Sequence, residues 1–499
     1  MSLLNDLAIR FDSWANPVLV KELRQAVQGR FVMGILLLFL LVSVSAMGVY
    51  AMQYEEGYTS YTDGKDMFMF FWGALVIAGC ALIPINASAR FSKELEANRT
   101  ELLFSTNLSP GAIVRGKLLS AIVLAVLIYT ACLPFMTLTY LLRGIDVVSI
   151  LMMLIYGLLC VVFAVQFTLF IGSFPLSKAF KAILGLILLA AIGYFCAGII
   201  ASAYMMLRFG FFSLMRSWEQ FWLPVSLTVG SALAAGGLLY VLTVAMITPS
   251  SANRALPVRL YLGVVWLVAG GILGYMARHY GDSVPLEIWA IGTSGVLLFA
   301  LLIGISERET IGPRLRKQIP RNVLLRIPVF FLYSGAAGGV LWVLGIFAIT
   351  QWILWWVKTS KSLGLRHEHD LEHSVTFMIV WMLYFLGYAM LGILVKRVVW
   401  ALSGRRLRPT WAITMVLMVV FMVAPPLLGF FTGSHLASKQ AWAWYLTNPM
   451  ATFYYYRHIE TFLLAGKMCA GITLLLNSPW FWRQIRNFKP LPSSPPQET

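Results

Sequence analysis

Eight residues, Gly111–Leu118 with the sequence GAIVRGKL, have the spacing of a phosphate-binding loop up to their last position. Such a loop needs a Ser or Thr hydroxyl there to hold magnesium, and it must join a buried strand to a helix. The chain has Leu118 at that position, and the preceding residues are the polar Ser105, Thr106 and Asn107. No Asp follows four apolar residues to act as the second magnesium ligand. We therefore predict that the chain itself binds no nucleotide and needs no cofactor.

A second group that could do chemistry is Arg366–His373, RHEHDLEH, which holds three of the six histidines. His369, Glu372 and His373 fit the H-x-x-E-H pattern, in which two His four residues apart bind zinc on one helix face. His367 is the only further ligand nearby, and no soluble domain is evident that could hold a peptide substrate. We interpret the segment as a solvated loop without a metal. The alternative is a metal-binding membrane enzyme that uses His367, His369 and His373.

The cysteines give no sign of a metal site or a disulfide. All five lie within apolar runs, and none has the spacing of a zinc site. Because cysteine is often buried as a small apolar side chain, we expect only packing from them. They are Cys80, Cys132, Cys160, Cys196 and Cys469.

Composition indicates which elements must position these residues. Of the 499 residues, 59% are hydrophobic and 12% are charged, whereas soluble domains average about 25% charged residues. About 20 apolar residues of helix cross the hydrocarbon core of a membrane. We therefore predict an all-α polytopic integral membrane protein with about twelve transmembrane helices. They lie near 31–52, 67–89, 118–142, 147–174, 183–207, 222–247, 260–277, 287–305, 329–350, 374–395, 411–431 and 459–478.

Residues 1–30 predict an amphipathic interfacial helix ahead of the first span. Asn16 offers an N-cap, and Pro17 suits the first helical position. Such a helix lies in the plane of the membrane interface, and a plain membrane anchor is the alternative. Its two faces carry Leu19, Leu23 and Val27 and, opposite them, Lys21, Arg24, Gln25 and Gln28.

Positive charge is unequally shared between the two sides of the predicted membrane. With a cytoplasmic N-terminus, the inner segments carry most of the 38 Lys and Arg residues, as the positive-inside rule requires. The formal charge of +17 then indicates attraction to anionic lipid rather than to nucleic acid. We predict that both termini are cytoplasmic and that the membrane is the inner membrane of a bacterium. The inner segments are 1–30, 90–117, 175–182, 248–259, 306–328, 396–410 and the C-terminal tail.

Polar residues inside the predicted spans are few. Lys467 is the main charged one, and Asn86 and Gln166 are the neutral ones of note. Ionisable residues within spans mark ion and proton pathways, and neither paired acids nor His chains occur here. Energy for any transport must therefore come from outside the chain.

Residues 90–117 form the most informative polar segment. Alternating charges from Lys93 to Glu101 lead into the apolar Leu102-Leu103-Phe104 and then into the helix-breaking Ser109-Pro110-Gly111. This order predicts a polar helix, a turn and a second, short helix that enters the third span. An ordinary solvated loop is the alternative.

Three ordered motifs in the first half resemble the type-2 permease of ATP-binding-cassette (ABC) exporters. They are NPVLVKELRQ before the first span, ExxRTELLFSTNLSPGxIxxGKLL between the second and third spans, and Leu133-Pro134-Phe135 within the third. The resemblance covers about residues 15–247. It implies an interfacial helix, six spans, and a coupling segment that docks on a separate ATPase subunit. The second six spans look like those of extended permeases with additional transmembrane helices.

The resemblance also assigns residues to roles by their place in these motifs. It implies a permease that works as a homodimer or as paired permease units with cytosolic ABC ATPase subunits, and that is not itself an enzyme. The interfacial-helix residues are Lys21, Glu22 and Arg24. The coupling-segment residues are Glu94, Glu96, Arg99, Glu101, Leu102, Leu103, Ser105, Ser109, Pro110, Gly116 and Lys117.

A polar break near 248–259 divides the chain into two halves of six predicted spans. The second half echoes the first in layout, because its second span also leads into a charged inner segment, 307–328. We interpret this as a duplication of layout. The expected parts are the interfacial helix 1–30, the permease-like unit 31–247, the linker 248–259, a second unit 260–488 and a disordered tail 489–499. A membrane scaffold that moves no substrate is a further alternative.

Overall fold

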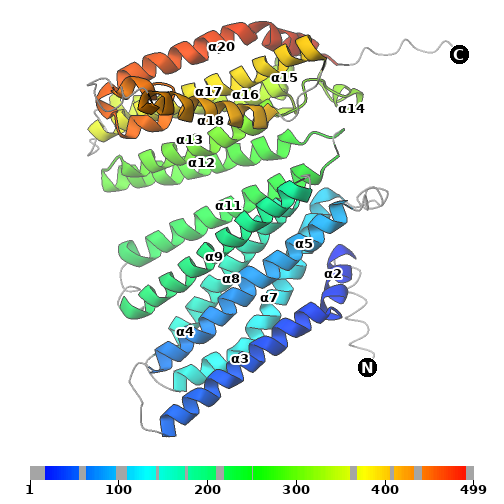
Figure 1. Cartoon of the computed structure of the whole chain (residues 1–499), viewed down its shortest axis with the longest axis vertical. Helices are drawn as coiled ribbons and strands as arrows, with labels where there is room; N and C mark the ends of the chain where they lie inside the picture. Colours follow the sequence, from blue (N-terminus) through cyan, green and yellow to red (C-terminus); the bar gives the residue numbers. More distant parts are fainter. Residues whose placement is uncertain are drawn as a thin grey trace, which may run out of the picture. The chain divides into compact units, whose positions relative to one another are not determined.

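The computed structural model describes most of the chain (Figure 1). The described residues are helical and contain no strand. They divide into two compact units, Met1–Thr248 and Pro249–Thr499. The described ranges are 17–55, 63–96, 109–141, 145–174, 178–209, 218–249, 251–359, 368–404, 410–431 and 441–490.

Twelve described helices are long and apolar enough to cross a membrane, six in each unit. Each matches one of the predicted spans, so the all-α polytopic membrane fold is confirmed. The reason is that a backbone in hydrocarbon must satisfy its own hydrogen bonds, which a helix does within one segment.

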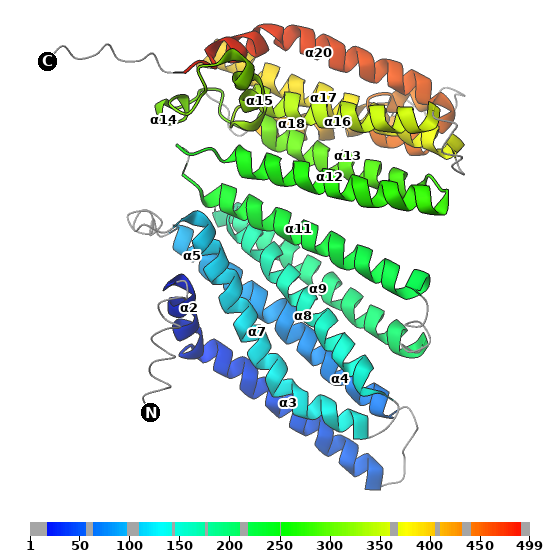
Figure 2. The same cartoon turned by 180° about the vertical axis from the view of Figure 1, so that it is seen from behind.

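The described part of the first unit starts with the short helix α2 (Pro17–Val27), which lies beside the start of α7 (Figure 2). Its spans are α3 (Arg30–Glu55), α4 (Asp63–Val76) with α5 (Ile83–Glu96), α7 (Pro110–Leu141), α8 (Val147–Gly172), α9 (Lys178–Phe209) and α11 (Leu223–Ile247). A π-helical stretch, Ile77–Leu82, joins α4 to α5 into one span, and another, Trp218–Trp222, precedes α11. Asp146 caps α8, because its carboxylate accepts hydrogen bonds from the N–H and hydroxyl of Ser149.

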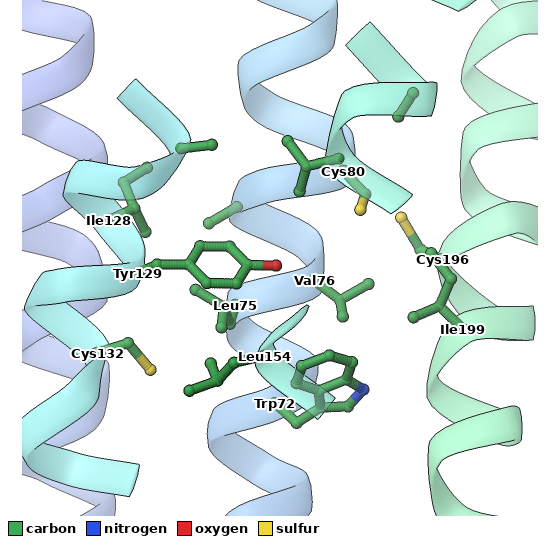
Figure 3. Packing of buried hydrophobic residues seen from close by; sticks show 14 of the residues in the cluster. Trp72, Leu75, Val76, Cys80, Ile128, Tyr129, Cys132, Leu154, Cys196 and Ile199 are labelled. Carbon is green, nitrogen blue, oxygen red and sulfur yellow. The ribbon is translucent and has the colours of Figure 1, made fainter. Parts of the chain in front are cut away.

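The core of this unit is packed around the second span. Figure 3 shows side chains of the second span, among them Trp72 and Cys80, meeting Tyr129 of α7 and Cys196 of α9. Gly157 makes room for this packing, since a Cβ there would lie 2.6 Å from both Trp72 and Tyr129. The second span is therefore the central element that the third, fourth and fifth spans contact.

The second unit has the spans α12 (Ala255–Tyr280), α13 (Val284–Ile305), α16 (Ala336–Thr359), α17 (Glu368–Ser403), α18 (Thr410–Phe431) and α20 (Ile459–Asn487). Two short helices, α14 (Pro313–Arg316) and α15 (Val323–Leu332), lie between α13 and α16. Three 3₁₀ turns, Ala441–Tyr445, Pro449–Phe453 and Tyr456–His458, precede α20. Buried side chains of α13, α16 and α17 make the core, for example Leu301, Leu354 and Met390.

Two predicted details are wrong. The ninth span was expected at 329–350, but residues 323–332 form the separate helix α15, and the span begins at Ala336. The expected short helix that enters the third span is not a separate element, because α7 runs without a break from Pro110 to Leu141. Ser109 accepts a hydrogen bond from the N–H of Ala112, and Pro110 needs no N–H partner at the first helical position.

Candidate functional site

Lys117 joins three helices of the first unit through two short ion pairs. Its Nζ lies 2.6 Å from Glu22 Oε1 of α2 and 2.7 Å from Glu94 Oε2 of α5. The side chains of Lys117 and Glu22 are only 6% and 9% exposed. Because the ammonium group donates to both carboxylates, the arrangement ties α2, α5 and α7 together at one end. We call these three residues the Lys117 cluster.

Helix α2 packs on α7 along one narrow face. Val18, Glu22 and Ala26 recur four residues apart and are all buried. At their crossing, a Cβ on Gly116 would lie 2.8 Å from the Cβ of Val18, so glycine is required for this approach. This close crossing brings Glu22 of α2 to Lys117, the residue that follows Gly116 in α7.

The surroundings of the Lys117 cluster are mixed in polarity. The Nζ of Lys117 lies 5.5 Å from the centre of the Phe91 ring, over its face, which adds a cation–π contact. A crevice beside the cluster is lined by residues of α2, α3, α5 and α7, including Asn86, Arg90 and Ser120. Asn86 was one of the polar residues predicted within a span, and it lies at this site.

The predicted coupling residues fall into three groups. Glu22, Glu94 and Lys117 come together, and Gly116 supports them. Lys21 and Arg24 are exposed on α2, and Ser109 and Pro110 begin α7. Arg99, Glu101, Leu102, Leu103 and Ser105 lie outside the described residues, and Glu96 ends α5 with its side chain undescribed.

Lys117 was assigned to the coupling segment by the family resemblance, and its burial was not predicted. A solvated lysine at a membrane edge would be exposed, whereas this one is buried between two carboxylates. The sequence gave an indication of the pair, since Glu94 and Lys117 lie near the two ends of the polar segment 90–117. Nothing in the sequence indicated that Phe91 or Val18 would lie at this site.

The structure describes only part of the predicted histidine cluster. His367 lies outside the described residues, and His369 belongs to α17 with its side chain undescribed. The ring of His373 stands edge-on to the ring of Tyr456, with 4.9 Å between centroids. Among the described residues, no three His, Cys, Asp or Glu side chains are grouped so as to hold a metal ion.

A second buried ion pair lies in the second unit and was not predicted. Arg259 of α12, 5% exposed, donates from Nη2 to both carboxylate oxygens of Glu307 at 2.6 Å. Its Nη1 donates to the carbonyls of Phe331 and Tyr333, and Glu307 also accepts from the N–H of Gly335. These bonds hold the break between α15 and α16. They explain why the ninth span starts later than predicted.

Replacing Gly116 with Ala tests the crossing of α2 and α7. The added Cβ must displace Val18, so we expect a loss of about 1–3 kcal/mol in the free energy of unfolding. Gly185→Ala in α9 is the matched control, because a Cβ there meets nothing within 4 Å. Chemical denaturation of both variants in detergent micelles makes the comparison. Equal stability of the two variants would contradict the close crossing.

Comparison with family models, with curated proteins and with solved structures finds no match.

Proposed function

We propose that this chain is the membrane subunit of an ATP-driven transporter of the ABC type, an exporter coupled through residues 90–117 to a separate ATPase subunit. The observation that carries the proposal is the Lys117 cluster. Residues 97–108 leave α5 shortly after Glu94 and lead into α7, where Lys117 lies. Because one ammonium group binds both flanks and α2, a force applied to the segment acts on three helices together.

Two further observations support this proposal. The described part of the chain has twelve membrane-spanning helices and little soluble structure, so the ATPase has to be another chain. The distribution of Lys and Arg favours a cytoplasmic position for the Lys117 cluster, where such an ATPase could reach it. A bacterial inner membrane with both termini inside belongs to the same proposal.

The second unit fits the role of a paired permease half. In both units the second span contacts the third, fourth and fifth, and the sixth contacts the fourth. These relations hold for α4–α5, α7, α8, α9 and α11 and, in the same order, for α13, α16, α17, α18 and α20. The shared packing order supports a duplicated unit, although the residues differ.

Replacing Leu102 and Leu103 with Ala tests the coupling segment. We expect the variant to lose the ATPase subunit on purification, a chain recognised by its GxxxxGKS/T and LSGGQ motifs, and to lose substrate-stimulated ATP turnover in vesicles. The matched control is Leu324→Ala with Leu325→Ala, an exposed leucine pair in the inner segment of the second unit.

Unchanged ATPase binding in the Leu102 and Leu103 variant would show that the segment is not the docking surface. Wild-type vesicles that bind the ATPase but show no substrate-stimulated turnover would instead support the scaffold alternative. Equal loss in both double variants would mean that the effect is not specific to residues 90–117.

A further inference from the structure

A groove in the second unit lies between α12, α13 and α16. Its volume is about 430 Å³, within the range of about 300–1,000 Å³ that is typical of small-molecule sites. Three tryptophans, Trp266, Trp289 and Trp356, form part of its lining, and the remaining residues are almost all apolar. No residue of the Lys117 cluster or of the Arg259–Glu307 pair belongs to it.

The groove exists because one face of α12 lacks side chains. Gly270, Gly271 and Gly274 lie along it. A Cβ on Gly271 would meet nothing within 4 Å, and one on Gly274 would meet only Leu286 at 3.9 Å. The face is therefore open rather than filled by a neighbouring helix of the same unit.

Two of the three tryptophans, Trp266 and Trp289, are fixed by hydrogen bonds. Trp289 Nε1 donates to the carbonyl of Trp266 at 3.1 Å, and Trp266 Nε1 donates to Thr350 Oγ1 at 3.0 Å. Gly270 is needed here, since a Cβ would lie 2.9 Å from the Trp289 indole. These two side chains are thus held in place without a ligand, as a preformed binding site requires.

Length and charge indicate what fits the groove. Trp266 and Arg278 are twelve residues apart on α12, which is about 18 Å of helix at 1.5 Å per residue. This is close to half of the roughly 30 Å hydrocarbon core, the depth of one lipid chain. Arg278 lies at the end of the groove nearest the α12–α13 turn, and it is the one charged residue of the lining.

Arg278 is available to an anionic group. The nearby carboxylates are engaged elsewhere: Asp282 accepts from the N–H of Val284, and Glu287 accepts from the hydroxyls of Ser283 and Ser374. Within the part of the chain that the structure describes, Arg278 has no ion-pair partner. An apolar groove that ends at one cation is complementary to an anionic lipid, whose hydrocarbon chain ends at a negatively charged headgroup.

We propose that this groove binds one hydrocarbon chain of an anionic phospholipid, whose headgroup phosphate pairs with Arg278. The tryptophans and the glycine face contact the chain, and Arg278 selects the headgroup. The inference does not depend on ATP-driven transport, because it requires only the second unit. It assigns the open face of α12 a lipid ligand rather than another helix.

Photolabelling of the full-length chain tests the proposal. The protein is reconstituted in phosphatidylcholine vesicles that contain a trace of phosphatidylglycerol with a photoreactive chain end. We expect adducts near Trp266, at the end of the groove away from Arg278. Gly271→Leu with Gly274→Leu fills the groove, and we expect about tenfold less labelling, which is about 1.4 kcal/mol. Gly263→Leu on the same helix is the control, because its Cβ also meets nothing within 4 Å and it lies outside the groove.

Arg278→Gln provides an independent measurement that does not change the shape of the groove. We expect its phosphatidylglycerol labelling to fall to the level of an equivalent phosphatidylcholine probe in the wild type. Equal labelling of the wild type by the two probes would overturn the headgroup assignment. Labelling unaffected by the double leucine variant would show that the probe does not lie in the groove, and a wild type without adducts in the groove would overturn the lipid assignment.

Discussion

Replacing Lys117 with Met is expected to destabilise the first unit by about 3–5 kcal/mol, the usual cost of removing one partner from a buried ion pair. The variant leaves Glu22, 9% exposed, and Glu94, 24% exposed, beside each other without a cation. Two carboxylates that share a poorly solvated site repel one another. Denaturant-induced unfolding in detergent micelles, followed by circular dichroism, gives the change in free energy.

The controls for Lys117→Met distinguish a lost ion pair from a lost charge in general. Arg115→Met removes an exposed cation from the same turn of α7, and we expect a change within about 0.5 kcal/mol. Adding Glu22→Gln to Lys117→Met should recover part of the lost stability, because it removes the repulsion between the two carboxylates and leaves only the partly exposed Glu94 charged. If Lys117→Met is as stable as Arg115→Met, the Lys117 cluster contributes little to the stability of the unit.

The Lys117 cluster also links stability to the proposed coupling. If α2, α5 and α7 move as one body, Lys117→Met should reduce substrate-stimulated ATP turnover more than it reduces binding of the ATPase subunit. The reason is that residues 101–103, the proposed contact, are unchanged, whereas their connection to α2 and α7 is weakened. An equal loss of binding and turnover would indicate that the cluster only shapes the docking surface.

Replacing Glu307 with Gln is expected to destabilise the second unit by about 3–5 kcal/mol. The change leaves Arg259, 5% exposed, without the one carboxylate partner that it has among the described residues, although its bonds to the carbonyls of Phe331 and Tyr333 remain. Because Glu307 also accepts from Gly335, the break between α15 and α16 should loosen. Hydrogen exchange should then lose protection around 323–335 before the rest of the unit.

Glu309→Gln is the matched control for Glu307→Gln. Glu309 pairs with Lys396 at 2.8 Å in the same inner segment, but these side chains are 36% and 24% exposed. Solvated pairs of this kind contribute up to about 1 kcal/mol. Equal destabilisation by the two variants would contradict the importance of burial, and unchanged exchange at 323–335 would contradict the proposed hold on the break.

The two ion pairs occupy comparable places in the two units. Lys117 binds the end of the second span to the third, and Glu307, just after the second span of its unit, binds the residue before the third. The cations come from different helices, α7 in one case and α12 in the other. This difference agrees with units that share a packing order and differ in residues.

Most of the fold could be predicted from the sequence. A run such as Phe31–Met52 has no charged residue, and hydrocarbon accepts such a run only as a helix. The ninth span shows where this reasoning fails. Residues 323–332 are as apolar as a span, and contacts from Asn253, Arg259 and Glu307, outside this segment, hold the break that separates them from α16.

The candidate site was predictable in part. Glu22, Glu94 and Lys117 could be chosen from charge, spacing and a family resemblance, and the structure places all three in one cluster. Their pairing could not be foreseen, because Glu22 and Lys117 are 95 positions apart and several other acidic residues lie closer to Lys117 in the sequence. Gly116 decides the pairing, since it allows α2 to cross α7 at this point.

The sequence by itself determined that this is an all-helical membrane protein with twelve spans and a polar segment between the second and third. It could do so because composition and apolar run length depend on the solvent around each helix, which is a local property. The tertiary structure alone decided that Lys117 is buried between two carboxylates, that Arg259 holds the break before α16, and that α12 has an open groove. These depend on which helices meet and how closely, and such contacts join residues whose types do not name their partners.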